Sequence, residues 1–196
     1  MDFAFDLLQG AGIAAAIGIR PFLPVLLVGA LAAGNLGLDF GGTDFAFLEQ
    51  APLLAVVLAL LALATYAVRR GGPQATETGL YALSFAALAV VLGALEAAGS
   101  LADRDHPVVP GILAGAATAA LGYVAGRSLL QRTRRRLDVE AAAALPLYVE
   151  GVAMLAAGVS ILFPPLAVLV IGGLVALLTG GRRRAGEKYA GLRILR

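Results

Sequence analysis

The sequence predicts an all-α protein that crosses a membrane several times. Of its 196 residues, 60% are hydrophobic and only 14% are charged, and the mean hydropathy is +0.87. Soluble domains are about 45–50% apolar and about 25% charged, so this composition is typical of a chain that folds in lipid. Long apolar runs indicate helices, which satisfy their own backbone hydrogen bonds inside a bilayer.

Six apolar segments qualify as spans of a single membrane domain that covers residues 1–196. A bilayer core about 30 Å thick needs about 20 apolar helical residues. The 40 residues 141–180 are too long for one span, and the Pro164-Pro165 pair divides them, because proline cannot continue a helix. The predicted spans are 7–33, 51–69, 77–98, 107–130, 141–162 and 164–180, followed by a basic tail at 181–196.

The positive charges of the loops predict the orientation. Arginines cluster at 69–70, 132–136 and 182–184, and basic loops remain in the cytoplasm. Six spans place these clusters on one side, with both chain ends and the tail in the cytoplasm. A re-entrant first segment would instead put the N-terminus outside and leave five spans. Six are favoured, because the 27 residues of 7–33 are enough to cross.

A weak internal repeat suggests a 3+3 inverted repeat. Residues 9–31 align without gaps on residues 150–172, with five identities in 23 positions, and both segments carry Phe followed closely by Pro near their centre. Transporters are often built from inverted repeats that meet at broken helices. Some of the six spans are therefore expected to be short or broken by proline.

Two charges are expected deep in the membrane. Arg20 lies in the first span beside Pro21 and Pro24, and Glu150 lies about ten residues into the fifth. An intramembrane charge is expensive and normally faces protein or a water-filled cavity. The pattern predicts a site in which Arg20, Glu150 and the proline-opened backbone bind a substrate. A fixed structural ion pair between Arg20 and Glu150 is the alternative.

Acidic residues gather where the third span ends. If that helix continues, Glu96, Ser100 and Asp103 share one face. We interpret Glu96 as part of the substrate site, with Asp103, Asp105 and His106 at its outer entrance. The alternatives are a solvated acidic loop or a weak oxygen-ligand metal site.

Small residues line the fourth span at helical spacing. Gly111, Gly115, Gly122 and Gly126 form a stripe that lets another helix backbone approach closely. The neighbour is either another helix of this chain or a second copy, so a homo-oligomer is one expectation.

Several classes of function are disfavoured. The chain has no cysteine and one histidine, which excludes thiolate chemistry and multi-histidine metal sites. It lacks the nucleophile elbow, the phosphate-binding loop and the His-Glu-x-x-His motif. We therefore expect no enzyme activity, cofactor, metal or nucleic-acid partner.

Four elements together resemble a family of bacterial membrane proteins, domain of unknown function 4126. They are residues 20–24 (Arg-Pro-Phe-Leu-Pro), Leu95-Glu96 followed by Ala102-Asp103, Glu150, and residues 188–193 (Lys-Tyr-Ala-Gly-Leu-Arg). The resemblance spans almost the whole chain and implies a multi-pass protein of the bacterial cytoplasmic (inner) membrane. It supplies no activity.

The leading hypothesis is a small permease or channel for a small anion or a proton-coupled solute. The alternative is a non-transporting scaffold, assembly factor or subunit, in which Arg20 and Glu150 form a sealed pair. An intramembrane enzyme that acts on a lipid is a third reading. The lipid bilayer is a partner in all of them.

Overall fold

The computed structural model describes residues 3–71, 79–134, 137 and 139–190. This part of the chain is helical and contains no strand, which confirms the predicted fold class. Its elements are α1 (Phe3–Ile19), α2 (Phe22–Ala33), η1 (Ala46–Leu48), α3 (Ala51–Gly71), α4 (Gly79–Ala102), α5 (Val108–Arg134), α6 (Val139–Leu162), η2 (Pro164–Leu166) and α7 (Ala167–Ala190).

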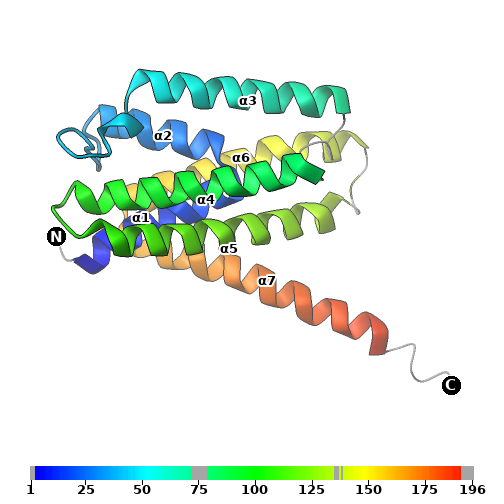
Figure 1. Ribbon diagram of the computed structural model, residues 1–196. Coiled ribbons are helices and arrows are strands. Elements are labelled where there is room, and N and C mark those ends of the chain that lie inside the picture. Colours follow the sequence, from blue (N-terminus) through cyan, green and yellow to red (C-terminus); the bar gives the residue numbers. More distant parts are fainter. Residues whose placement is uncertain (1–2, 72–78, 135–136, 138, 191–196) are drawn as a thin grey trace.

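The helices lie side by side in a bundle with α1 at its centre (Figure 1). Helix α1 packs against α4, α5, α6 and α7. Helices α3, α5 and α7 run in one direction, and α4 and α6 run in the other (Figure 1). We call the end where α3, α5 and α7 finish the basic end, because α3 and α5 each finish with two arginines. The opposite end, with residues 34–50 and 103–107, is the loop end.

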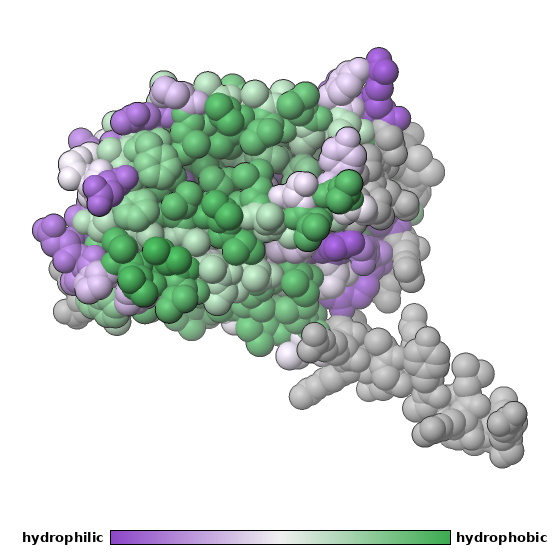
Figure 2. Space-filling model, viewed as in Figure 1, coloured by the Kyte–Doolittle hydropathy of each residue, from purple (hydrophilic) through white to green (hydrophobic). Residues whose placement is uncertain are grey.

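Four helices of the described residues are long and apolar enough to cross a membrane. They are Ala51–Arg70, Gly79–Ala102, Val108–Arg134 and Ala144–Leu162. Residues Pro164–Gly180 form a shorter apolar helix. Helix α7 extends beyond Gly180 to Ala190, so the first ten residues of the predicted tail are helical. Figure 2 shows apolar residues covering the side of the bundle, with hydrophilic residues gathered towards its ends.

The first predicted span, 7–33, is a helical hairpin broken at Arg20-Pro21 and not one continuous helix. Helix α1 ends at Ile19 and α2 begins at Phe22. Proline disfavours the helical conformation in the residue before it, and Pro21 follows Arg20. The chain then turns back, so that Gln9 near the start of α1 donates a hydrogen bond from Nε2 to the carbonyl of Gly37, just beyond α2 (3.1 Å). The re-entrant alternative describes this geometry.

With this hairpin, the start of α1 and the end of α7 lie at opposite ends of the bundle, an arrangement that differs from the expected common side of the two chain ends. At the loop end, the ring of Phe3 packs edge-on against that of His106, with centroids 5.3 Å apart. At the basic end, Arg132 Nη2 donates a hydrogen bond to the carbonyl of Leu177 in α7 (3.2 Å). Helix α1 therefore starts at the loop end and α7 finishes at the basic end (Figure 1), because α2 returns the chain to the end where α1 began.

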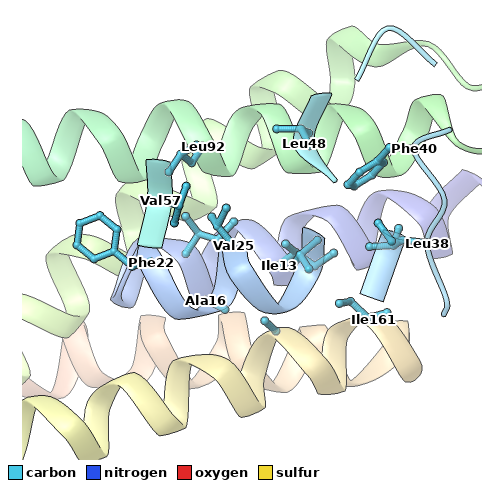
Figure 3. Packing of buried hydrophobic residues seen from close by; sticks show 14 residues of the cluster. Ile13, Ala16, Phe22, Val25, Leu38, Phe40, Leu48, Val57, Leu92 and Ile161 are labelled. Carbon is cyan, nitrogen blue, oxygen red and sulfur yellow. The ribbon is translucent and has the colours of Figure 1, made fainter. Parts of the chain in front are cut away.

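The hydrophobic core forms around the hairpin (Figure 3). Ile13 of α1 and Phe22 and Val25 of α2 are buried with residues of the loop between α2 and α3, notably Phe40 and Leu48. The cluster also contains Leu92 of α4, Val57 of α3 and Ile161 of α6. The hairpin is therefore surrounded by protein, and all ten residues 9–18 of α1 are buried.

The glycine stripe of α5 packs within the chain, as one of its two interpretations predicted. A Cβ on Gly111 would lie 2.7 Å from the Ala97 carbonyl oxygen, and one on Gly115 would lie 2.6 Å from the Gly93 carbonyl oxygen, both in α4. A Cβ on Gly122 would meet the Ala15 carbonyl of α1, and Gly126 faces Ile19 at 3.5 Å. The homo-oligomer stays a prediction without support from this stripe.

Two proline-turn hairpins run in opposite directions. The α1–α2 turn contains Pro21, and the α6–α7 turn contains Pro164 and Pro165. Helix α1 packs against α6 and α7, and α6 packs against α1 and α2. Each hairpin contains one of the two aligned segments, 9–31 and 150–172. The 3+3 repeat itself stays a prediction.

Adding one methyl group to the stripe should destabilise the protein. Gly122→Ala should lower the free energy of unfolding by about 1–3 kcal/mol, because its Cβ would meet α1 backbone that cannot move without repacking. Gly172→Ala in α7 is the matched control, since nothing lies within 4 Å of its Cβ position; alanine there should be neutral or add up to about 1 kcal/mol. Thermal unfolding followed by circular dichroism measures both, and equal behaviour of the two variants would contradict the packing.

Candidate site at the tip of the helical hairpin

The turn between α1 and α2 places Arg20 inside the bundle. The Arg20 N–H donates the last helical hydrogen bond of α1, to the Ala16 carbonyl (3.2 Å). Pro21 is the N-cap of α2, and Pro24 is buried in its first turn. The first N–H groups of a helix have no partner within the helix, so proline, which lacks an N–H, breaks no helical hydrogen bond there. The two prolines therefore begin α2 and fix the direction in which Arg20 leaves the turn.

Arg20 and Glu150 form an ion pair between the hairpin tip and the middle of α6. Arg20 Nε lies 4.0 Å from Glu150 Oε1, and the two side chains are 14% and 13% exposed. The backbone N–H of Leu23 also donates a hydrogen bond to the Glu150 carboxylate. Since the N-terminus of a helix carries partial positive charge, the start of α2 and Arg20 both attract this anion.

The ion pair leaves some of its hydrogen-bonding capacity unused. Arg20 Nε and Glu150 Oε2 are buried and have no hydrogen-bond partner among the described residues. A separation of 4.0 Å is an electrostatic contact and exceeds the range of a hydrogen bond. The arrangement can therefore accept a further polar partner without first losing a hydrogen bond between the two side chains.

A small cavity lies on the other side of the hairpin tip. It has a volume of about 30 Å³ and is lined by Ile19, Arg20, Pro21, Phe85, Tyr123, Arg127 and Leu130. The Tyr123 hydroxyl donates a hydrogen bond to the Ala82 carbonyl (2.6 Å), which ties α5 to α4 beside the cavity. This volume holds about two water molecules. Two arginines make the cavity attractive to an anion.

Glu96 does not belong to this site, in contrast to its predicted role. It is fully buried in α4, next to Ala97, which faces Gly10 near the start of α1. Arg20 lies at the far end of α1. Of the predicted substrate-binding residues, the structure brings Arg20, Pro21, Pro24 and Glu150 together around the α1–α2 turn and places Glu96 towards the loop end.

A second polar cluster surrounds the start of α1. His106 Nε2 lies 3.3 Å from Asp6 Oδ2, and Ser100 Oγ donates a hydrogen bond to Gln9 Oε1 (3.3 Å). Gln9 Nε2 also donates to the Ile161 carbonyl (3.0 Å). Asp6 and Gln9 are absent from the predicted site. Their spacing of three on an otherwise apolar helix, which puts them on one face, is the signal that could have found them.

The predicted outer entrance is only partly formed. Helix α4 ends at Ala102, so Asp103 follows the helix and pairs with its neighbour Arg104 (3.1 Å). Asp105 is exposed, and His106 contacts Asp6. Among the described residues no group of three His, Cys, Asp or Glu could hold a metal ion.

Comparison of the chain with protein-family models, curated proteins and solved structures finds no match. The resemblance to domain of unknown function 4126 therefore remains an expectation.

Removing one partner of the ion pair should be costlier than removing both. Arg20→Met should lower the free energy of unfolding by about 3 kcal/mol, because it leaves Glu150 enclosed without its cation. Adding Glu150→Gln should recover part of this loss. Arg69→Met, at an exposed position near the end of α3, is the control for loss of an arginine. Unfolding of the single and double variants in detergent measures the coupling, and purely additive effects would show that the pair does not interact.

Proposed function

We propose that this protein is a small permease or channel of the bacterial cytoplasmic membrane that conducts a small anion or a proton-coupled solute. One observation carries the proposal: an arginine and a glutamate meet at the tip of a re-entrant helical hairpin, beside a cavity lined by two arginines. Broken helices whose ends face a binding site are a common feature of transporters. An arginine at membrane depth is functional by default.

The contacts suggest how an anion would be held. Arg20 borders both Glu150 and the cavity. An anion that enters the cavity can become the partner of Arg20, while the Leu23 N–H still donates to the Glu150 carboxylate. Glu150 and the bound anion are both negative, and both would be attracted to the positive charge of Arg20. Binding of the anion therefore weakens the attraction between α6 and the hairpin tip. The hairpin is the element whose position would then change.

The positive charges give the proposed orientation. Helices α3 and α5 finish with Arg69, Arg70, Arg132 and Arg134 at the basic end, and basic segments remain in the cytoplasm. The start of α1 and the loop 34–50 then face the opposite side of the membrane. The cavity, lined by Arg127 and Leu130 from the last two turns of α5, lies nearer the cytoplasm.

One observation favours the non-transporting alternative. The cavity of about 30 Å³ holds water molecules and no organic solute, and the ion pair is mostly enclosed. A scaffold or assembly factor would keep the pair in this state permanently. The two functions therefore differ in whether an aqueous reagent ever reaches the cavity.

Single cysteines can test for aqueous access, because the natural chain contains none. Cysteine placed at Ile19, which lines the cavity, should react with a membrane-impermeant thiol reagent in sealed vesicles of known orientation. Inorganic phosphate or chloride in excess should slow this reaction, since an anion at Arg20 would shield the site. The rate of labelling is measured from each side.

Two variants serve as controls. Asp44→Cys lies in an exposed loop and should react from the side opposite the basic end. Leu147→Cys lies on the exposed apolar surface of α6 and should be shielded by lipid. If Asp44→Cys reacts while Ile19→Cys reacts from neither side, the permease is refuted and the sealed scaffold is the better description.

A further inference from the structure

Glu96 is a buried carboxyl group that the site at the hairpin tip does not use. Its side chain is 0% exposed, and neither carboxyl oxygen has a hydrogen-bond partner among the described residues. One helical turn away on either side lie Leu92, which belongs to the hydrophobic core, and Ser100, which is also buried. A charge enclosed in this way without a partner costs several kcal/mol or more, so Glu96 needs a positive partner.

The described residues beside Glu96 offer no ligand set for a metal ion, and the helix surfaces on either side of it pack closely. A Cβ on Gly99 would lie 2.9 Å from the Phe40 ring, and one on Gly10 would lie 3.0 Å from the Ala97 backbone. Cations such as Ca²⁺ need six to eight oxygen ligands, whereas no group of three acidic or histidine side chains that could hold a metal is found in the described part of the chain. A proton needs one lone pair and no added volume.

Polar groups lead from Glu96 towards the loop end. Ser100 lies one turn nearer that end and donates to Gln9 Oε1 (3.3 Å). Asp6 lies three residues before Gln9 on α1 and contacts His106 Nε2 (3.3 Å). The His106 side chain is 27% exposed and connects the series with solvent.

Along α4, no such series runs from Glu96 towards the basic end. The part of α4 on that side, residues 79–95, has two polar side chains, Tyr81 and Ser84. Tyr81 is exposed on the outer surface, and the Ser84 hydroxyl is used by its own helix, through a hydrogen bond to the Leu80 carbonyl (3.0 Å). Within α4, polar side chains therefore continue from Glu96 only towards the loop end.

Other charged groups near this part of the bundle come from three elements. Helix α1 contributes Asp6, and α2 carries no charge. The face of α5 that packs on α4 is formed by glycine and alanine. The remaining charged groups of the loop end are Asp39, Asp44, Glu49, Asp103, Arg104, Asp105 and His106. Of these, Glu49 accepts a hydrogen bond from the Phe40 N–H (3.1 Å), and Asp103 pairs with Arg104.

We propose that Glu96 is a proton-binding site reached from the loop end, along the groups His106, Asp6, Gln9 and Ser100. The proton comes from water at the membrane surface and joins one Glu96 oxygen, so that the carboxylate becomes a neutral carboxyl. No other bond is made or broken. The interpretation of this proton as the coupling ion rests on the proposed permease function, to which it adds a specific proton-binding residue.

Infrared difference spectroscopy of the full chain in lipid vesicles tests the site directly. Raising the pH should remove the C=O stretching band of a neutral carboxyl in an apolar environment, and acidification from the alkaline buffer should restore it. Glu96→Gln should abolish this band, and Glu150→Gln should leave it. Glu96→Asp is the second variant, which should shift the band instead of removing it. Circular dichroism checks that each variant is folded. A band unchanged by Glu96→Gln in folded protein would overturn the proposal.

Hydrogen–deuterium exchange of the same band tests the route. His106→Ala and Asp6→Asn should keep the band and slow its shift in heavy water severalfold, whereas Tyr148→Phe, on the exposed surface of α6, should not change the rate. An unchanged rate in both route variants would overturn access from the loop end. Because the spectra need no transport, loss of the band in Glu96→Gln together with an unreactive Ile19→Cys would retain the proton site and refute the permease.

Discussion

The close approach of α1 to α4 and α5 is the constraint on which the rest of the structure depends. Glycine and alanine lie wherever these three backbones meet, and a Cβ on Gly93, Gly115 or Gly122 would come within 3 Å of a neighbouring helix. In lipid, helices gain little from burying apolar surface, so association relies on such close packing. Because the side chains of α1 are small, the larger residues of α2 and of the loop before α3 fill the core around it.

The positions of the polar groups follow from this packing. Helix α1 has protein on all sides along residues 9–18, so each polar group on it needs a partner from another element. At its start, Gln9 bonds to Ser100, Gly37 and Ile161. Just beyond its end, Arg20 faces Glu150. The two polar sites are therefore separated by residues 10–19 of α1, all of which are apolar.

Composition and loop charges were sufficient to predict the helical class, most helix positions and the common side of the basic clusters. They failed at the first segment, because the length of 7–33 permits a crossing and only the path of the chain after Pro21 shows that it turns back. The contact between Arg20 and Glu150 agrees with one of the two interpretations offered for them, since two isolated charges in an apolar chain have few other partners. The enclosure of Glu96 within the protein was not predicted, because Gly10 of α1 and Phe40 of the loop 34–50, which pack on α4 beside it, are distant in sequence.

The enclosed position of α1 also bears on how the protein is made. A spanning helix can enter the membrane alone as it leaves the ribosome, but α1 precedes along the chain all the helices that enclose it. It is 17 residues long and followed by a helix of 12, so neither is long enough to span on its own. The helices that enclose α1 most extensively, α4 and α5, are synthesised much later. The hairpin can therefore reach its enclosed position only after α4 and α5 have been made, although it precedes both along the chain.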